Sequence, residues 1–164
     1  MFPINKKQIL IGTITLVIGV LIYFIDRPPN DTYFVYKISN GISLYDMLPG
    51  LFGPFGSILP AFIHVFSFSL ITAGLLGCGM RGYLVICSIW LAIDLAFELG
   101  QKFDVWVSGL IPDFSGIPLL EVGKDYFIFG TFDYYDLAAI VFGAIAAFFI
   151  MCKTMPRRIN HGIQ

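Results

Sequence analysis

Four apolar stretches of nearly twenty residues constrain this chain more than any other feature. They cover about residues 8–25, 59–78, 83–100 and 133–152. A helix needs about 20 mostly apolar residues to cross the roughly 30 Å hydrocarbon core of a bilayer. Only 13% of the residues are charged, whereas a soluble domain has about a quarter. The sequence therefore predicts an all-α membrane protein in which residues 1–164 form one transmembrane domain, a four-helix bundle.

The first apolar stretch also resembles the core of a signal peptide, because Lys6 and Lys7 precede it. It is long for a signal peptide, and Asp26 to Pro29 follow where a small-residue cleavage site would lie. We therefore interpret residues 8–25 as a transmembrane helix that the mature protein retains.

Two long segments, residues 26–58 and 101–132, separate the predicted helices and are rich in Pro, Gly and aromatic residues. Aromatic side chains favour the headgroup level of a membrane. Within the second segment, residues 117–122 are predicted to form a short interfacial helix. These segments are the two long, aromatic-rich loops of the predicted fold.

The distribution of Lys and Arg predicts which side of the membrane each loop occupies. Basic residues without acidic neighbours lie at the two termini and in the short connection between the second and third helices, whereas the long loops contain many carboxylates. By the positive-inside rule, both termini are cytoplasmic and both long loops are external. The basic residues that support this orientation are Lys6, Lys7, Arg81, Lys153, Arg157 and Arg158.

The third predicted helix contains three polar residues within the apolar sequence WLAIDLAFELGQ. Asp94, Glu98 and Gln101 are spaced i, i+4, i+7 and therefore share one helix face. Ionisable residues inside a membrane are costly and usually face the bundle interior. At about 1.5 Å per residue, polar residues of two further helices fall in the same outer half of the membrane: His64, Asp133 and Asp136.

This shared depth predicts a polar site that opens outward. Two carboxylates one turn apart in an apolar environment disfavour double ionisation, so one holds a proton or pairs with a donor such as His64. Such a group performs acid–base chemistry or binds a cation. The candidate catalytic residues are Glu98, Asp94 and His64, and the candidate substrate-binding residues are Gln101, Asp133 and Asp136.

Structural interpretations of the same residues remain open. Buried carboxylates can form a hydrogen-bonded network that fixes helix packing. His64 by itself is typical of a satisfied core histidine, and Asp133 precedes a helix, where Asp is a favoured N-cap. Asp94 has no helix end to explain it.

Other site classes find little support in the sequence. One intramembrane His without a metalloprotease-type pair does not predict a metal site or another cofactor. No Ser lies in a nucleophile-elbow pattern, and no basic run predicts nucleic-acid binding. Cys78, Cys87 and Cys152 fall in predicted cytoplasmic halves, and we do not expect any of them to be a nucleophile.

The last predicted helix contains a row of small residues, Ala139, Gly143 and Ala147. Small residues four apart allow a neighbouring helix to approach closely. The row therefore predicts a tight helix–helix contact, within the bundle or in a homo-oligomer.

Two motifs resemble those of the VanZ-like membrane proteins. They are ELGQ at Glu98–Gln101 and GTFDYYDLAAIVFG from Gly130 to Gly143. Family members typically have an Arg near the position of Gly130 and an Asn at the position of Ile140, and this chain lacks both. The resemblance implies a bacterial inner-membrane protein of a family named after glycopeptide antibiotic resistance, without an established reaction.

The leading functional hypothesis is a site that binds or modifies a lipid or another cell-envelope component, such as a cell-wall precursor. The alternative is a non-enzymatic assembly or interaction protein whose carboxylates are structural. A proton-coupled transporter is less favoured, because the cytoplasmic halves offer no carboxylate to continue a relay.

Overall fold

The computed structural model describes residues 3–28, 42–45, 47–48, 50–53, 55–110, 127 and 130–156. These residues include four helices that are long and apolar enough to cross a membrane. Residues 117–122, predicted to form a short helix, lie outside the described part. The four long helices are α1 (Lys6–Ile25), α3 (Phe55–Leu76), α4 (Met80–Lys102) and α7 (Tyr134–Lys153).

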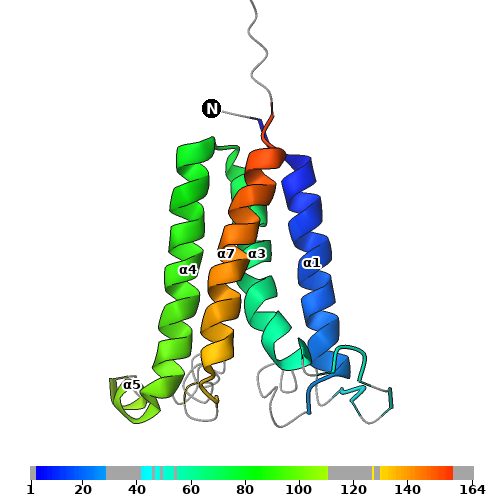
Figure 1. Ribbon diagram of the computed structural model, residues 1–164, viewed down its shortest axis with the longest axis vertical. Coiled ribbons are helices and arrows are strands. Elements are labelled where there is room, and N and C mark those ends of the chain that lie inside the picture. The colour runs from blue at the N-terminus through cyan, green and yellow to red at the C-terminus, as the bar shows by residue number, and fades with distance from the viewer. Residues whose placement is uncertain are drawn as a thin grey trace, which may run out of the picture.

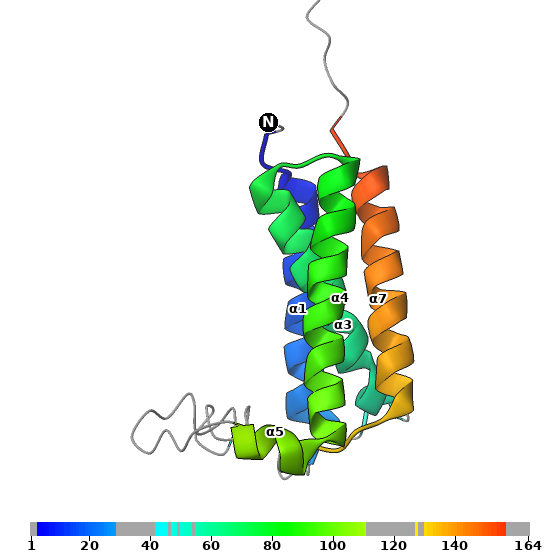
Figure 2. The same ribbon diagram turned by 90° about the vertical axis from the view of Figure 1, so that its left-hand side faces the viewer.

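The four long helices run side by side along the long axis of the molecule (Figures 1 and 2). α3 packs against each of the other three, and α7 also packs against α4. The first residues of α1 and the last residues of α7 lie at the same end of the bundle, which we call the terminal end (Figure 1). The opposite end, where α4 finishes, is called the loop end.

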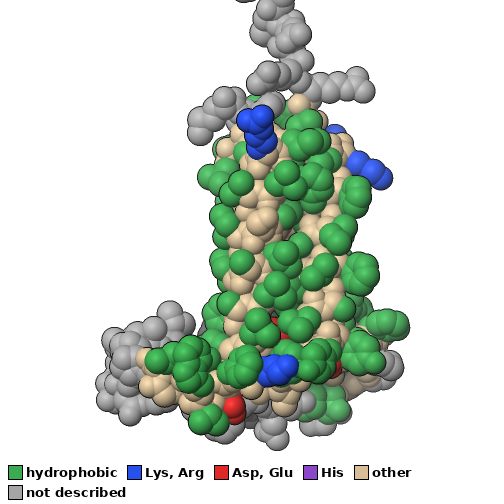
Figure 3. Space-filling view, turned by 60° about the vertical axis from the view of Figure 1, so that its left-hand side comes forward, with side chains coloured by type: hydrophobic (Ala, Val, Ile, Leu, Met, Phe, Trp, Pro, Cys, Tyr) green, Lys and Arg blue, Asp and Glu red, His purple; other side chains and the backbone are tan. Residues whose placement is uncertain are grey.

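The surface of the bundle has the character expected for contact with lipid. Figure 3 shows apolar side chains along the whole length of the helices, with charged side chains gathered at the two ends. Many large apolar residues in the four long helices are exposed. A soluble protein rarely exposes so continuous an apolar surface. The prediction of an all-α bundle with four membrane-spanning lengths is therefore confirmed at the level of helix length, composition and packing.

Small residues bring the helices into close contact, as predicted for the row on α7. A Cβ atom added at Gly143 would lie 2.6 Å from the backbone oxygen of Phe62 on α3. Ala139 and Ala147 are buried on either side of it. Since α3 of the same chain covers this row, an interface between two copies would need another face of the molecule.

The terminal end of the bundle is closed by an uncharged network around Gln8. Its Nε2 donates to the hydroxyls of Tyr83 and Thr154 and to the carbonyl oxygen of Met151. The amide of Asn5 donates to the carbonyl of Thr154. These bonds join α1, α4 and α7 without a charged side chain.

α3 begins at Phe55, four residues before the predicted start at 59, and Pro60 lies inside the helix rather than in its first turn. Proline has no N–H, so the carbonyl four residues earlier, that of Gly56, lacks its helical donor. Arg27 supplies donors here: its Nε is 3.5 Å from the Gly56 oxygen, and a terminal nitrogen bonds the Ser57 oxygen. A guanidinium from the end of α1 thus supports an early start of α3.

In the described part of the chain, the loop end contains a short helix that was not predicted. α5 (Asp104–Leu110) follows α4 after a single residue, Phe103, and lies inside the segment interpreted as loop. Figure 2 shows α5 running across the bundle axis.

At the same end of the bundle, the carboxylate of Asp26 accepts backbone N–H bonds from Leu51 and Phe52. These bonds attach this part of the first long loop to the end of α1.

Candidate functional site

A histidine–aspartate pair joins α3 and α4. The Nδ1 atom of His64 lies 2.9 Å from Oδ1 and 2.8 Å from Oδ2 of Asp94. Asp94 is 7% exposed, whereas the His64 side chain is 46% exposed. The carboxylate therefore orients the ring from inside the bundle, and Nε2 is on the far side of the ring, away from Asp94.

Two aromatic side chains, those of Phe68 and Trp90, pack against the His64 imidazole. The ring of Phe68 is 4.5 Å from that of His64, and the ring of Trp90 is 6.1 Å away. Phe68 and Trp90 stack on each other, and the Trp90 indole N–H donates to the Thr72 hydroxyl at 3.1 Å. The orientation of His64 is thus fixed by one ionic partner and two packed rings.

Glu98, one turn further along α4, contacts the start of α7. Its Oε1 accepts the backbone N–H of Asp133 at 3.0 Å. The side chain of Asp133 accepts the N–H of Tyr135 and is the N-cap of α7, as one interpretation of the sequence expected. Glu98 therefore orders the junction between α4 and α7, and Asp133 orders the first turn of α7.

Asp136 faces the same region with one oxygen unsatisfied. Its Oδ1 is buried and has no hydrogen-bond partner among the described residues. The nearby charges are those of Glu98, Arg27 and Asp133. Buried polar atoms in native proteins nearly always have a partner, including ordered water. This oxygen is therefore placed to receive a donor from water or from a bound molecule.

Tyr23 on α1 and Arg27, two residues after the end of α1, also belong to this region. The sequence did not predict either of them as a site residue. Tyr23 lies within electrostatic range of Asp94, Glu98 and Asp136, and the guanidinium of Arg27 is 5.1 Å from the centre of the Tyr23 ring. Nothing in local sequence spacing indicates that the end of α1 approaches α4 and α7.

The polar residues lie along the bundle as a column from the loop end to its middle. Glu98 is four residues from the end of α4, about 6 Å, and Asp94 is eight residues from it, about 12 Å. His64 is nine residues after Phe55, about 14 Å from the start of α3. The His64–Asp94 pair therefore lies toward the middle of the bundle.

We use "polar column" for the residues that the structure brings together: His64, Asp94, Glu98, Asp133 and Asp136. Gln101, the third residue of the predicted face, is buried. In the described part of the chain its side chain makes no hydrogen bond to the column. Five of the six predicted site residues thus share one region, and Gln101 lies beside it.

The chemistry available to the polar column is that of acids, bases and hydrogen bonds. Within the described residues, no group of three or more His, Cys, Asp or Glu side chains could hold a metal ion. The cysteines are free thiols. Burial raises the pKa of the Cys78 thiol above its ordinary value, which reduces the thiolate fraction that a nucleophile requires.

The fold and the column define a class: a multi-pass helical bundle with a carboxylate-supported imidazole on its flank. No family model, curated protein or solved structure matches this chain.

Proposed function

We propose that this chain is a VanZ-like protein of the bacterial inner membrane whose polar column binds or modifies a lipid or cell-envelope component. Both termini are cytoplasmic in this proposal, and the column opens to the outer side. The proposal is supported by the motifs around Glu98 and Asp133, by the charge distribution at the helix ends and by the geometry of His64 and Asp94.

The observation that carries the proposal is the unequal burial of the pair. A structural ion pair is expected to have both partners packed, but here the carboxylate is buried and the imidazole is half exposed on the apolar flank. Near the middle of a membrane-spanning helix, the neighbours of an exposed side chain are lipids. An imidazole costs free energy there unless it meets a polar group.

The geometry suits proton transfer at Nε2 of His64. A carboxylate on Nδ1 fixes the tautomer and stabilises the imidazolium that forms when Nε2 accepts a proton. A hydroxyl of an amphiphilic lipid that reaches this depth would donate a hydrogen bond to Nε2. Glu98 and Asp136 then extend the acidic column toward the loop end, and Arg27 is the nearby cation for an anionic group.

A second function has its own supporting observation. The bond from the Asp133 N–H to Glu98 joins α4 to α7, as a structural carboxylate would. The alternative is thus a non-enzymatic assembly or interaction protein in which the carboxylates hold the bundle together. In that case substitutions that keep the hydrogen bonds would preserve function.

The terminal end of the bundle disfavours a transporter. The buried polar side chains there include Asn5 and Gln8, whose amides do not relay protons as carboxylates do. The described carboxylates of the column stop near the middle of the bundle.

A complementation experiment tests the proposal. Cells lacking the gene would receive the His64→Ala, Asp94→Asn or Glu98→Gln variant, and their sensitivity to cell-envelope antibiotics would be measured at matched membrane expression. We expect each variant to lose the wild-type phenotype. The control is Arg81→Gln, which removes a charge at the terminal end of the bundle, outside the column. Full activity in all three column variants would contradict the proposal.

A further inference from the structure

We propose that the corner between α4 and α5 binds the phosphate headgroup of an anionic phospholipid, with Lys102 as its cation and α5 as its platform. This site is separate from the acid–base role of the polar column. One can therefore fail while the other holds.

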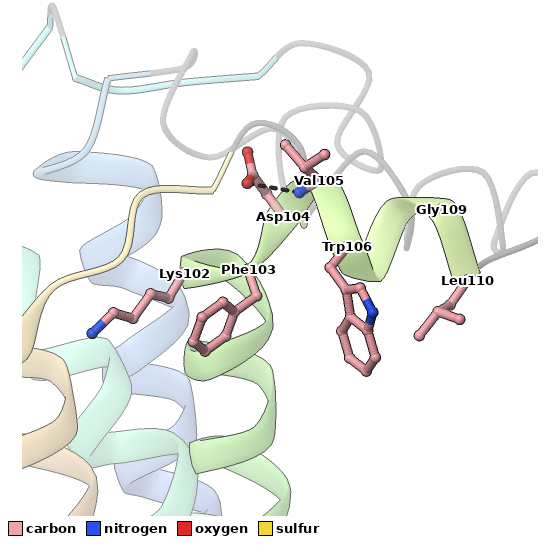
Figure 4. Close-up of a pocket in the computed structure, with 7 residues that line it drawn as sticks. All are labelled: Lys102, Phe103, Asp104, Val105, Trp106, Gly109 and Leu110. Carbon is pink, nitrogen blue, oxygen red and sulfur yellow. Dashed lines mark hydrogen bonds between the residues drawn. The ribbon is translucent and has the colours of Figure 1, made fainter.

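The side chains of α5 divide into two groups. Figure 4 shows Phe103, Trp106 and Leu110 on the side of α5 from which α4 approaches, while Asp104 and Val105 lie on the other side. The first three are strongly exposed, with Trp106 69% accessible. The carboxylate of Asp104 accepts the N–H of Val105. The apolar side of α5 thus faces back along the bundle.

The position of this apolar side selects lipid as its occupant. α5 continues α4 after one residue, so its apolar side adjoins the exposed flank of α4 that includes Leu99, one turn before Phe103. Because α4 ends here, α5 lies at the level where hydrocarbon gives way to headgroups. Trp beside Lys is typical of that level, where an apolar ring and a charged tip are both satisfied.

Lys102 supplies a positive charge at this corner. Its Nζ donates to the Tyr134 hydroxyl at 3.1 Å and lies 4.9 Å from the Phe132 ring centre and 5.1 Å from that of Tyr134. Among the described residues, no carboxylate forms an ion pair with it. The ammonium is therefore positioned by neutral groups, and its charge is left for a phosphate.

An open hollow at the corner provides room for a headgroup. Its volume is about 620 Å³. Basic, aromatic and aliphatic side chains line it, as a phosphate with its glycerol and upper acyl chains requires. The one acidic side chain in the lining, Asp104, is turned to the other side of α5, where its carboxylate accepts the N–H of Val105. The lining residues are Lys102, Phe103, Asp104, Val105, Trp106, Gly109 and Leu110 (Figure 4).

Tryptophan fluorescence tests this site, because the chain has two Trp residues. The Trp90→Phe variant leaves Trp106 as the single emitter and keeps a ring that can stack on Phe68. The protein would be reconstituted into phosphatidylcholine vesicles containing phosphatidylglycerol, with bromine on shallow or deep acyl positions of either lipid. If the Trp90→Phe variant does not fold, the emission of Trp106 is obtained instead by subtracting the spectrum of Trp106→Phe from that of the wild type.

We expect shallow bromines to quench Trp106 most and deep bromines to quench Trp90 most. Brominated phosphatidylglycerol should quench Trp106 more strongly than a random mixture of the two lipids would. The expected binding constant for phosphatidylglycerol relative to phosphatidylcholine is about 5, which corresponds to the attraction between one Lys and an anionic lipid surface. Lys102→Gln should bring that constant close to that of random mixing. Lys102→Arg and the control Arg81→Gln, at the other end of the bundle, should preserve it.

Three results would overturn the proposal. Quenching of Trp106 by aqueous acrylamide but not by bromolipids would place α5 away from the bilayer. Equal quenching by the two lipids would exclude a headgroup site, and a preference that survives Lys102→Gln would exclude Lys102 as the cation. Normal complementation by Lys102→Gln alongside any of these results would leave the polar column proposal standing.

Discussion

The Asp94→Asn substitution separates a functional carboxylate from a structural one. Asparagine has nearly the same shape as aspartate and can still hydrogen-bond to Nδ1 of His64. The carboxylate is 7% exposed, and its two oxygens lie 2.8 and 2.9 Å from that nitrogen. The substitution therefore removes the charge while leaving packing and one hydrogen bond in place.

The expected change in stability is the difference between two terms. Replacing a charge-assisted hydrogen bond with a neutral one costs about 1 kcal/mol. Removing a buried charge recovers part of its desolvation penalty, which is several kcal/mol for an ion taken out of water. We therefore expect the unfolding free energy of Asp94→Asn to stay within about 1 kcal/mol of wild type or to rise. The variant should nevertheless lose function, because carboxylates at functional sites often serve activity at a cost to the stability of the fold.

The assay is reversible unfolding in mixed micelles, followed by far-ultraviolet circular dichroism, with complementation measured in parallel. His64→Ala and the double variant complete a cycle that isolates the coupling between the two side chains. A loss of about 3 kcal/mol or more in Asp94→Asn, the cost of breaking a structural buried pair, would refute the reasoning if complementation persisted.

Three further predictions follow from the packing and the charge distribution. Gly143→Leu should lower the unfolding free energy by about 1–3 kcal/mol, because its side chain meets the backbone of α3; the same unfolding assay measures this. Arg27→Met should lower it by about 1–3 kcal/mol by removing the donor that replaces the missing Pro60 N–H at the Gly56 carbonyl, and adding Pro60→Ala should restore part of the loss. In a cysteine-free background, an impermeant maleimide added to whole cells should label Asp104→Cys but not Arg81→Cys, since the latter lies on the predicted cytoplasmic side.

Each of these predictions has a contradicting result. Wild-type stability in Gly143→Leu would mean that α3 and α7 are further apart than the structure shows. An equal loss with and without Pro60→Ala would mean that Arg27 does not replace the missing proline donor. External labelling of Arg81→Cys would reverse the proposed orientation.

The sequence predicted the four long helices well because each is an apolar run of membrane-spanning length. Such runs depend on local composition, so their existence did not require tertiary information. The start of α3 was predicted too late, because Pro60 in isolation indicates a first turn. The donors that support the earlier turns come from Arg27, distant in sequence, and a local pattern cannot reveal them.

The candidate site was predicted in part, for related reasons. Helical spacing placed Asp94 and Glu98 on one face, and similar depths suggested that His64 and Asp133 approach them; the structure confirms both contacts. Tyr23 was missed because the approach of α1 to the carboxylates depends on packing. α5 was missed because its seven residues are too short to show a helical period.

Lipid retained by the purified protein is a direct test of lipid binding at the polar column. Wild type, Asp94→Asn, Glu98→Gln and the control Arg81→Gln would be extracted from bacterial membranes in a mild detergent and analysed by native mass spectrometry. We expect wild type and Arg81→Gln to retain one class of lipid that both column variants lose. The same lipids at the same occupancy in all four proteins would contradict a lipid site at the polar column.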